Sequence, residues 1–212
     1  DHHKWYNVIK AQFSITPPED MSGIDGWYYE IDNNPRTVPT GSSTWTNKDT
    51  VFSGDLADGE WYLHVVSKDK AGNIGTTATH YRFNIDTVAK APKVFSKTHK
   101  DQEEWYNNST PELHWETPED LSGIEGYYCI VDAKHNTVPT KETGEFVKTN
   151  QLTLPYTEDG TWYFHIVSKD NAGNVGWEAE HFRFRIDTHV EAPKVTSATH
   201  PDCSRWYNNP QV

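Results

Sequence analysis

Cysteine is scarce in this chain, and long apolar runs are missing. Its 212 residues include two cysteines, Cys129 and Cys203, which fall at non-equivalent places in the repeats described below. A disulfide framework would need matched pairs in each repeat, so a disulfide-stapled fold is excluded. No apolar run reaches the roughly 20 residues of a membrane-spanning helix, and no signal peptide is visible. We therefore expect an internal piece of a longer chain, with no membrane insertion in this part.

Basic charge is also in short supply. Lys and Arg number 19 against 31 Asp and Glu, which gives a formal net charge of −12. Such a chain repels phosphate backbones and anionic lipid surfaces, so nucleic acid and membrane surfaces are not expected partners. The acidity leaves calcium open as a cofactor, and no other cofactor is expected.

Aromatic residues, by contrast, are abundant. Only 34% of the chain is hydrophobic, yet 13% is aromatic, with nine Trp and eleven Tyr. Large rings bury much area per residue and pack well on the pleated surface of strands. The composition therefore favours a β-rich fold over long helices or disorder.

The sequence repeats itself. The tripeptide Trp-Tyr-Asn at residues 5–7 recurs at 105–107, an offset of 100, and again at 206–208. Further matches pair residues 18–20 with 118–120, 37–40 with 137–140, 61–62 with 162–163, and 67–69 with 168–170. A period of about 100 residues is too long for a solenoid unit, so each repeat is expected to be a domain that can fold alone.

We predict three parts from this register. Residues 1–91 form a first β-sandwich repeat whose opening strand is missing or truncated, 92–192 form a second, and 193–212 start a third. The linkers, residues 87–92 and 188–193, are short, contain Pro and lack Gly. They are expected to restrict the angle between neighbouring domains.

Alternating runs within each repeat predict strands. From residue 162 to 170, Trp162, Phe164, Ile166 and Ser168 are predicted to face the core, with the residues between them, including His165, facing outward. The Asp-x-Ala-Gly-Asn loop that follows closes a hairpin, because Gly and Asn tolerate positive φ. Counting the other runs gives about seven strands, the usual number for a sandwich.

Several motifs carry a family resemblance. Residues 113–115 and 126–127 resemble two strands of fibronectin type III domains. The Asp-x-Ser-Gly-Ile, Trp-Tyr-x-His and Asp-x-Ala-Gly-Asn motifs resemble bacterial and archaeal Ig-like or fibronectin type III-like tandem repeats. Those repeats occur in large cell-surface proteins: S-layer-type proteins, adhesins and secreted multidomain proteins. The resemblance implies an all-β fold of two tandem seven-stranded Ig-like sandwiches plus the start of a third, at an extracellular or cell-surface location.

Histidine pairs are the first candidate site. Partners across the predicted hairpin have residue numbers with a constant sum, which pairs His64 with His80 and His165 with His181. Two imidazoles about 5 Å apart on the outward face could hold zinc or copper if a third ligand joined them. No Asp, Glu or Cys is evidently placed to be that ligand. A polar cross-strand pair is therefore the favoured interpretation.

Acidic turns are the second candidate. The residues that could offer oxygens to calcium in loops or linkers are Asp20, Asp69, Asp120 and Asp170, with Glu19, Glu119, Asp86 and Asp187. Calcium needs about six to eight oxygens in one place, and no EF-hand loop is present. Asp, Ser and Gly are also ordinary turn formers. Calcium at a loop or domain junction stays open, and no metal site is assigned.

Exposed rings are the third candidate. Trp45 and Trp177 do not fit the predicted cores, and flat rings can stack on sugars. They are the candidates for glycan binding, although single surface rings are common.

Nothing in the chain indicates catalysis. There is no Gly-x-Ser-x-Gly elbow, His-Glu-x-x-His helix or phosphate-cradling loop, so no catalytic residue is assigned and no enzyme is expected. The predicted function is a structural spacer of an extracellular surface protein, forming a semi-rigid rod, adhesin stalk or surface layer. The alternative is a carbohydrate-binding or accessory module of a secreted enzyme. The expected partners are neighbouring repeats of the same chain, with lateral copies and cell-surface glycans left open.

Overall fold

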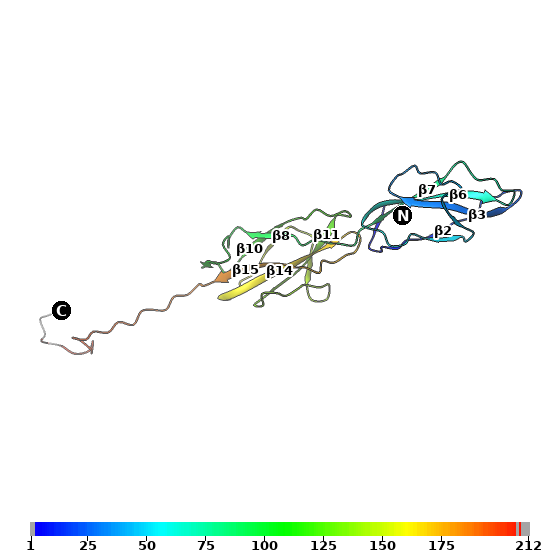
Figure 1. Ribbon diagram of the computed structural model, residues 1–212. Coiled ribbons are helices and arrows are strands. Elements are labelled where there is room, and N and C mark those ends of the chain that lie inside the picture. The colour runs from blue at the N-terminus through cyan, green and yellow to red at the C-terminus, as the bar shows by residue number, and fades with distance from the viewer. Residues whose placement is uncertain (1–2, 207, 209–212) are drawn as a thin grey trace.

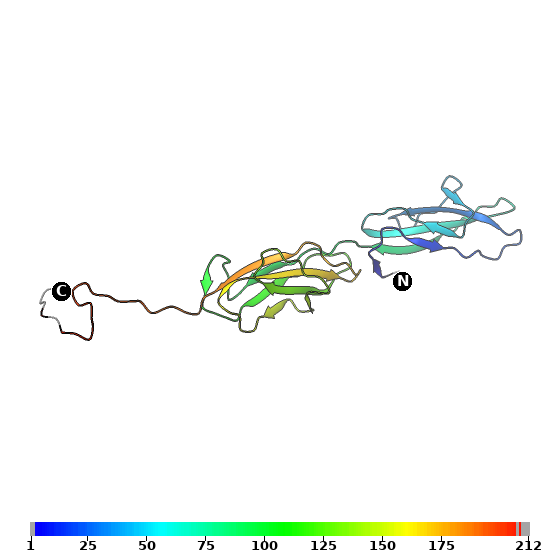
Figure 2. The same ribbon diagram turned by 90° about the horizontal axis from the view of Figure 1, so that it is seen from below.

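The chain forms two β-sandwiches placed end to end and joined by a short linker (Figures 1 and 2). The computed structural model describes residues 3–206 and 208. Within that part of the chain, no helix is long and apolar enough to cross a bilayer.

The first sandwich, repeat 1, contains β1 (Trp5–Tyr6), β2 (Gln12–Ser14), β3 (Ile24–Asp32), β4 (Thr44–Thr46), β5 (Thr50–Phe52), β6 (Gly59–Asp69) and β7 (Thr79–Ile85). The second, repeat 2, contains β8 (Lys93–Ser96), β9 (Trp105–Tyr106), β10 (Glu112–Glu116), β11 (Ile124–Asp132), β12 (Glu145–Val147), β13 (Gln151–Thr153), β14 (Gly160–Asp170) and β15 (Glu180–Ile186).

Repeat 2 is a sandwich with a core made mainly of rings. One sheet has the order β12-β11-β14-β15-β9 and the other β13-β10-β8. Between them Trp115 packs edge-on against Tyr127, with ring centroids 5.4 Å apart. It also packs in a tilted arrangement against Phe164, at a centroid distance of 5.7 Å. These facing rings explain how a chain poor in aliphatic residues closes a core. The all-β tandem-sandwich prediction is confirmed.

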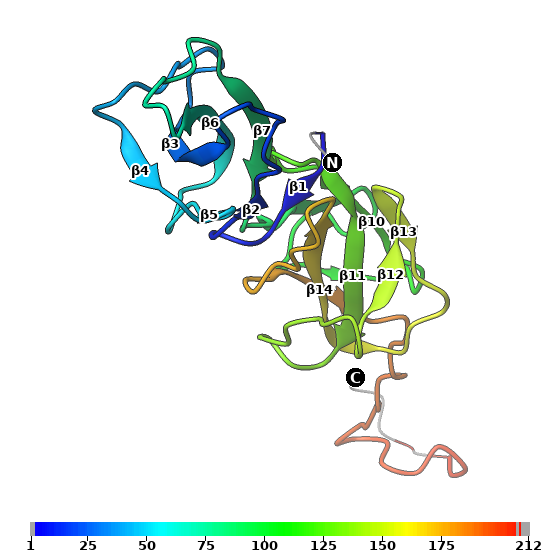
Figure 3. The ribbon, with the colours of Figure 1, turned by 90° about the vertical axis from the view of Figure 1, so that its right-hand side faces the viewer.

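The strand count differs slightly from the prediction. Eight strands lie between residues 93 and 186, against the seven expected. The additional strand is β9, which pairs in parallel with the end of β15, Trp105 opposite Arg185. In repeat 1 the same Trp-Tyr pair forms β1 beside β7 (Figure 3). The recurring Trp-Tyr-Asn motif is therefore a short ladder that ties the start of each repeat to its last strand.

The hairpin of β14 and β15 has the predicted register. Trp162 lies opposite Phe184 and His165 opposite His181. The loop turns at Gly173, whose φ of 98° favours glycine. The Asp170 carboxylate accepts hydrogen bonds from the backbone N–H groups of Gly173 and Asn174, each at 2.7 Å. The Asp-x-Ala-Gly-Asn sequence thus closes its own turn.

The outward residues of β14 are buried, which the alternation did not predict. His165 and Val167 are both 0% exposed although they face away from the sandwich core. The segment between β11 and β12 covers part of this face, because Pro139 is buried and lies with Tyr128 against Gly144. Period-two alternation separates the two faces of a strand, but it does not say whether a loop covers the second face.

Repeat 1 has an open edge. Its smaller sheet contains only β2 and β5 among the described residues, with no counterpart of β8. A hollow opens there onto core side chains, including Phe13, Trp27 and Leu63. Ile15, the counterpart of Trp115, lines the same hollow and is partly exposed. The core of repeat 1 therefore lacks the layer that β8 supplies in repeat 2.

The end of the chain carries a second copy of the β8 sequence. Residues 193–197 read Pro-Lys-Val-Thr-Ser, against Pro-Lys-Val-Phe-Ser at 92–96. They lie extended and exposed beyond repeat 2, and Val195 is 87% exposed (Figures 1 and 2). In repeat 2 the corresponding Val94 is buried opposite Trp115. The segment has the pattern of a β8 strand without the sheet that β8 joins.

A peptide of residues 192–200 should therefore bind the open edge of repeat 1. By the register of β8 on β10, its Val195 would lie opposite Ile15 and its Ser197 opposite Phe13. We expect saturable binding of the labelled peptide to a chain ending at residue 192, measured by fluorescence anisotropy. A Val195→Asp peptide is the control, because a charge cannot enter the apolar groove. Equal binding of both peptides would show that the groove does not accept this strand.

Candidate functional site

Asp86, the first residue after β7, connects the two repeats. Its backbone N–H donates to the carbonyl of Tyr6 in repeat 1 at 3.0 Å. Its carboxylate accepts from the Ser122 N–H of repeat 2 at 2.9 Å, and its carbonyl accepts from Asn174 Nδ2 at 2.7 Å. The residue is only 2% exposed. One linker residue is thus held by hydrogen bonds from both domains.

Two further linker residues are packed against repeat 2, while Val88 and Lys90 are exposed. Ala89 and Pro92 are buried, and a Cβ at Gly176 would lie 3.0 Å from the Ala89 carbonyl oxygen. A side chain at Gly176 would therefore press against the linker, and glycine leaves room for this close approach. The second linker, residues 188–193, and the preceding Asp187 are exposed except for the half-buried Thr188. The burial of the first linker thus comes from its contacts with repeat 2.

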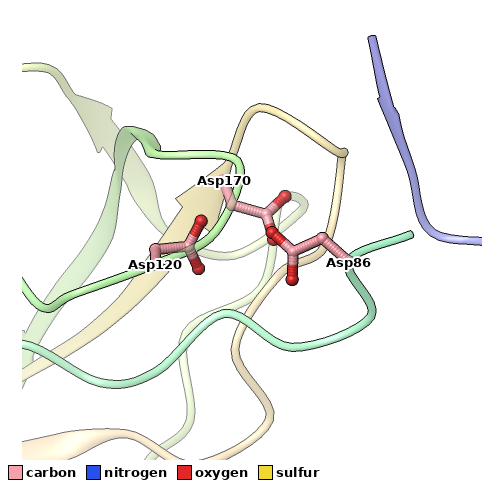
Figure 4. A group of neighbouring side chains, drawn as sticks. All are labelled: Asp86, Asp120 and Asp170. Atoms are coloured by element: carbon pink, nitrogen blue, oxygen red, sulfur yellow. The ribbon is translucent and has the colours of Figure 1, made fainter. Parts of the chain in front are cut away.

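Three carboxylates meet at this junction. Asp86 comes from the linker, Asp120 from the loop before β11 and Asp170 from the end of β14, and Figure 4 shows them facing one another. One carboxylate oxygen of each lies within 4.8 Å of the others. Among the described residues, no Lys, Arg or His forms an ion pair with any of the three.

Hydrogen bonds fix the carboxylates in place. Asp120 Oδ1 accepts from Ser122 N–H at 3.1 Å and from its hydroxyl at 3.0 Å. Asn174 Nδ2 donates to Asp170 Oδ2 at 2.6 Å as well as to the Asp86 carbonyl. The Asp-x-Ser-Gly-Ile and Asp-x-Ala-Gly-Asn motifs thus position one carboxylate each, and Asn174 links the second motif to the linker.

The three carboxylates of the cluster repel one another. Burial raises the pKa of the Asp120 carboxyl, and the negative charges of Asp86 and Asp170 raise it further. Two like charges about 4 Å apart repel by about 4 kcal/mol at an effective dielectric of about 20. A cation between the carboxylates would remove that repulsion.

The structure brings some of the acidic candidates from the sequence together and keeps the others apart. Asp120 and Asp170 come together with the linker residue Asp86. Their counterparts Asp20 and Asp69 line one hollow at the free end of repeat 1, together with Glu19. The remaining linker residue, Asp187, is exposed at the other end. Glu119 is not part of the cluster. Among the described residues, Asp86, Asp120 and Asp170 are therefore the one three-carboxylate cluster.

The histidine pairs form hydrogen-bonded chains. His64 Nδ1 lies 2.6 Å from His80 Nδ1, and His165 lies at the same distance from His181. The expectation that no acidic residue joins them was wrong, because Asp32 lies 3.2 Å from His64 Nε2 and Asp132 lies 3.3 Å from His165 Nε2.

This geometry favours a polar pair over a metal site. The carboxylate accepts from Nε2–H of the buried histidine, whose Nδ1 then accepts from its partner. Zinc binds imidazole nitrogens at about 2.0–2.1 Å in tetrahedral geometry, so two nitrogens on one ion lie well over 2.6 Å apart. The observed Nδ1–Nδ1 distance of 2.6 Å is therefore that of a hydrogen bond.

The two candidate tryptophans lie in different repeats and do not form one surface. Trp45 covers Gly26, where an added Cβ would lie 2.7 Å from the ring. It also packs against Tyr28 at a centroid distance of 4.9 Å, with Lys68 Nζ 5.0 Å above it. Trp177 is 76% exposed beside a shallow hollow. Trp45 thus has a packing role, and glycan binding remains a prediction.

Comparisons with known proteins add little beyond the fold. No protein-family model and no curated protein matches the sequence. The fibronectin(III)-like modules of Clostridium thermocellum CbhA are similar over 92% of this chain and 95% of that chain, with 12% identity and a TM-score of 0.37. A set of titin domains is similar over 87% of this chain and 61% of that chain, with 12% identity and a TM-score of 0.44. The fold assignment depends on the strands described above.

The histidines make repeat 2 sensitive to acid. Burial lowers the pKa of His181 below its usual 6.5, and the charges of His165 and His135 lower it further. The unfolded chain then binds a proton more readily than the folded one, so stability is complete above about pH 6.5 and is lost as pH falls below it. We expect the melting temperature of repeat 2 to fall by about 2–5 °C between pH 7.5 and pH 5.5.

The variant His181→Asn tests the source of this slope. The asparagine amide Nδ2 occupies the position of the histidine Nδ1 and can donate to His165 but does not titrate, so the melting temperature should depend less on pH. Burial also lowers the pKa of His99, so part of the slope should remain in the variant. Identical pH profiles for the two chains would exclude the His165–His181 pair as the source.

Proposed function

We propose that the chain is a structural spacer of an extracellular surface protein, in which tandem sandwiches form a semi-rigid rod. The observation that carries this proposal is the burial of Asp86 between the repeats. A flexible tether would leave its linker solvated, as Gly/Ser-rich linkers do. Here the linker donates to one domain and accepts from the next, so the angle between the sandwiches is restricted.

The repeated geometry supports the same function. The Tyr6 carbonyl accepts from Asp86 at 3.0 Å, and the Tyr106 carbonyl accepts from Asp187 at 2.9 Å. Each sandwich therefore directs its outgoing linker in the same way. Repeating one domain with one junction gives a rod of regular geometry, which suits the stalk of an adhesin or the units of a surface layer.

The extracellular location is part of the proposal. It is supported by the motifs shared with prokaryotic surface repeats and by the net charge of −12, which keeps a long array soluble. Its partners would be neighbouring repeats of the same chain, with lateral copies in a layer.

A second candidate function is glycan binding as an accessory module of a secreted enzyme. The observation in its favour is Trp177, exposed beside Val138 and Pro139. Its counterpart in repeat 1 is Thr76, so this ring is not required by the repeat architecture. Binding to a polysaccharide that is lost in Trp177→Ala without loss of stability would favour this second function.

Solution scattering with a matched pair of variants tests the spacer. Gly176→Val places a side chain against the Ala89 carbonyl and should loosen the linker from repeat 2. Gly75→Val is the control, because the equivalent glycine of repeat 1 has no linker beside it and its nearest neighbour is 3.5 Å away. In EDTA, we expect the parent and the control to be elongated monomers with the same maximum particle dimension.

The Gly176→Val chain should instead give a broader distribution of shapes. A parent chain that already samples many interdomain angles would contradict the proposed spacer function.

A further inference from the structure

The three-carboxylate junction has a composition that selects one kind of ligand. Asp86, Asp120 and Asp170 offer oxygen atoms only, and Asp86 and Asp170 are buried. Burying ionised carboxylates is costly unless they are paired or coordinate a metal. The N–H donors that hold them orient the carboxylates but carry no positive charge.

A second, independent observation points to a bound ion. The hydroxyl of Ser168 is buried and has no hydrogen-bond partner among the described residues. Ser168 precedes Asp170 by two positions on β14, so the two side chains leave the same face of the strand. In repeat 1 the counterpart Ser67 lines the same hollow as Asp20 and Asp69. Strand geometry thus places the orphaned hydroxyl on the face of β14 that carries the Asp170 carboxylate.

We propose that the junction binds one calcium ion between the Asp86, Asp120 and Asp170 carboxylates. The Ser168 hydroxyl donates an oxygen lone pair to the ion or to a water bound to it. Oxygen-only donors suit a hard cation and not zinc or copper, which prefer nitrogen and sulfur ligands. Three carboxylates offer up to six oxygens, the lower end of the six to eight that calcium takes, whereas magnesium usually takes one or two carboxylates and keeps its waters.

The ion would act as a clamp between domains. Two of its carboxylates belong to repeat 2 and the third follows the last strand of repeat 1, so the site is complete only when both repeats are in place. Asp20 with Asp69, and Asp187, are the counterparts of these three ligands elsewhere in the chain. This inference rests on the proposed spacer function and adds its regulation: the rod is stiffest where calcium is plentiful, as it is outside cells.

Isothermal titration with calcium chloride, after treatment with EDTA, tests the proposal. We expect one ion per chain with a dissociation constant of about 10⁻⁴–10⁻³ M, typical of extracellular modules. Asp120→Asn should weaken binding at least tenfold. Asp20→Asn is the matched control, because the equivalent residue of repeat 1 has no linker carboxylate beside it, and it should leave the titration unchanged.

Thermal unfolding separates loss of binding from loss of folding. In EDTA, Asp120→Asn should melt at the same temperature as the parent or higher, because it removes one repelling charge. In 5 mM calcium, the parent should gain about 5 °C or more and the variant should gain little. Ser168→Ala should weaken calcium binding several-fold, and Ser67→Ala should not.

Absence of calcium binding, or equal loss in Asp120→Asn and Asp20→Asn, would overturn the proposal. A chain that is elongated and rigid in EDTA yet binds no calcium would overturn the ion site and leave the spacer function standing.

Discussion

Asp86 is the residue on which the arrangement of the two sandwiches depends. Its backbone N–H donates to the Tyr6 carbonyl of repeat 1. Its carboxylate accepts from the Ser122 N–H of repeat 2, and its carbonyl accepts from the Asn174 side chain of repeat 2. Because a buried carboxylate must keep all of its partners, a change of interdomain angle would break several hydrogen bonds at once. The junction therefore joins the two sandwiches by hydrogen bonds on both sides of one residue.

The turn motifs of each sandwich serve this junction as well as the fold. Asp-x-Ser-Gly-Ile and Asp-x-Ala-Gly-Asn are self-closing turns in both repeats, since Asp20 and Asp69 accept the same kinds of local hydrogen bonds as Asp120 and Asp170. Only in repeat 2 does a linker carboxylate reach them. The same motifs thus close a turn in both repeats and, in repeat 2, also contribute to the junction.

Much of the fold could be predicted from the sequence, because the repeat fixes equivalent residues and strand alternation fixes faces. The pairing of His165 with His181 followed from the hairpin symmetry alone. The meeting of Asp86 with Asp120 could not be predicted, because it depends on how two domains dock. Nor could the Asp132 contact of His165, since that aspartate lies at the end of a neighbouring strand. Loops that cover a sheet face leave no periodic signal, so the burial of His165 was also beyond sequence patterns.

The most direct measurement of the junction is a distance between spin labels on the two repeats. The labels would be attached to cysteines that replace the exposed Lys48 and Lys141, in a chain that also carries Cys203→Ser. Pulsed electron paramagnetic resonance would then report the distance between the two repeats. Cys129 is buried and should not react. A junction held by Asp86 predicts one narrow distance distribution that broadens in Asp86→Ala and stays narrow in Asp187→Ala. A broad distribution in the parent chain, or no change on removing Asp86, would contradict the account.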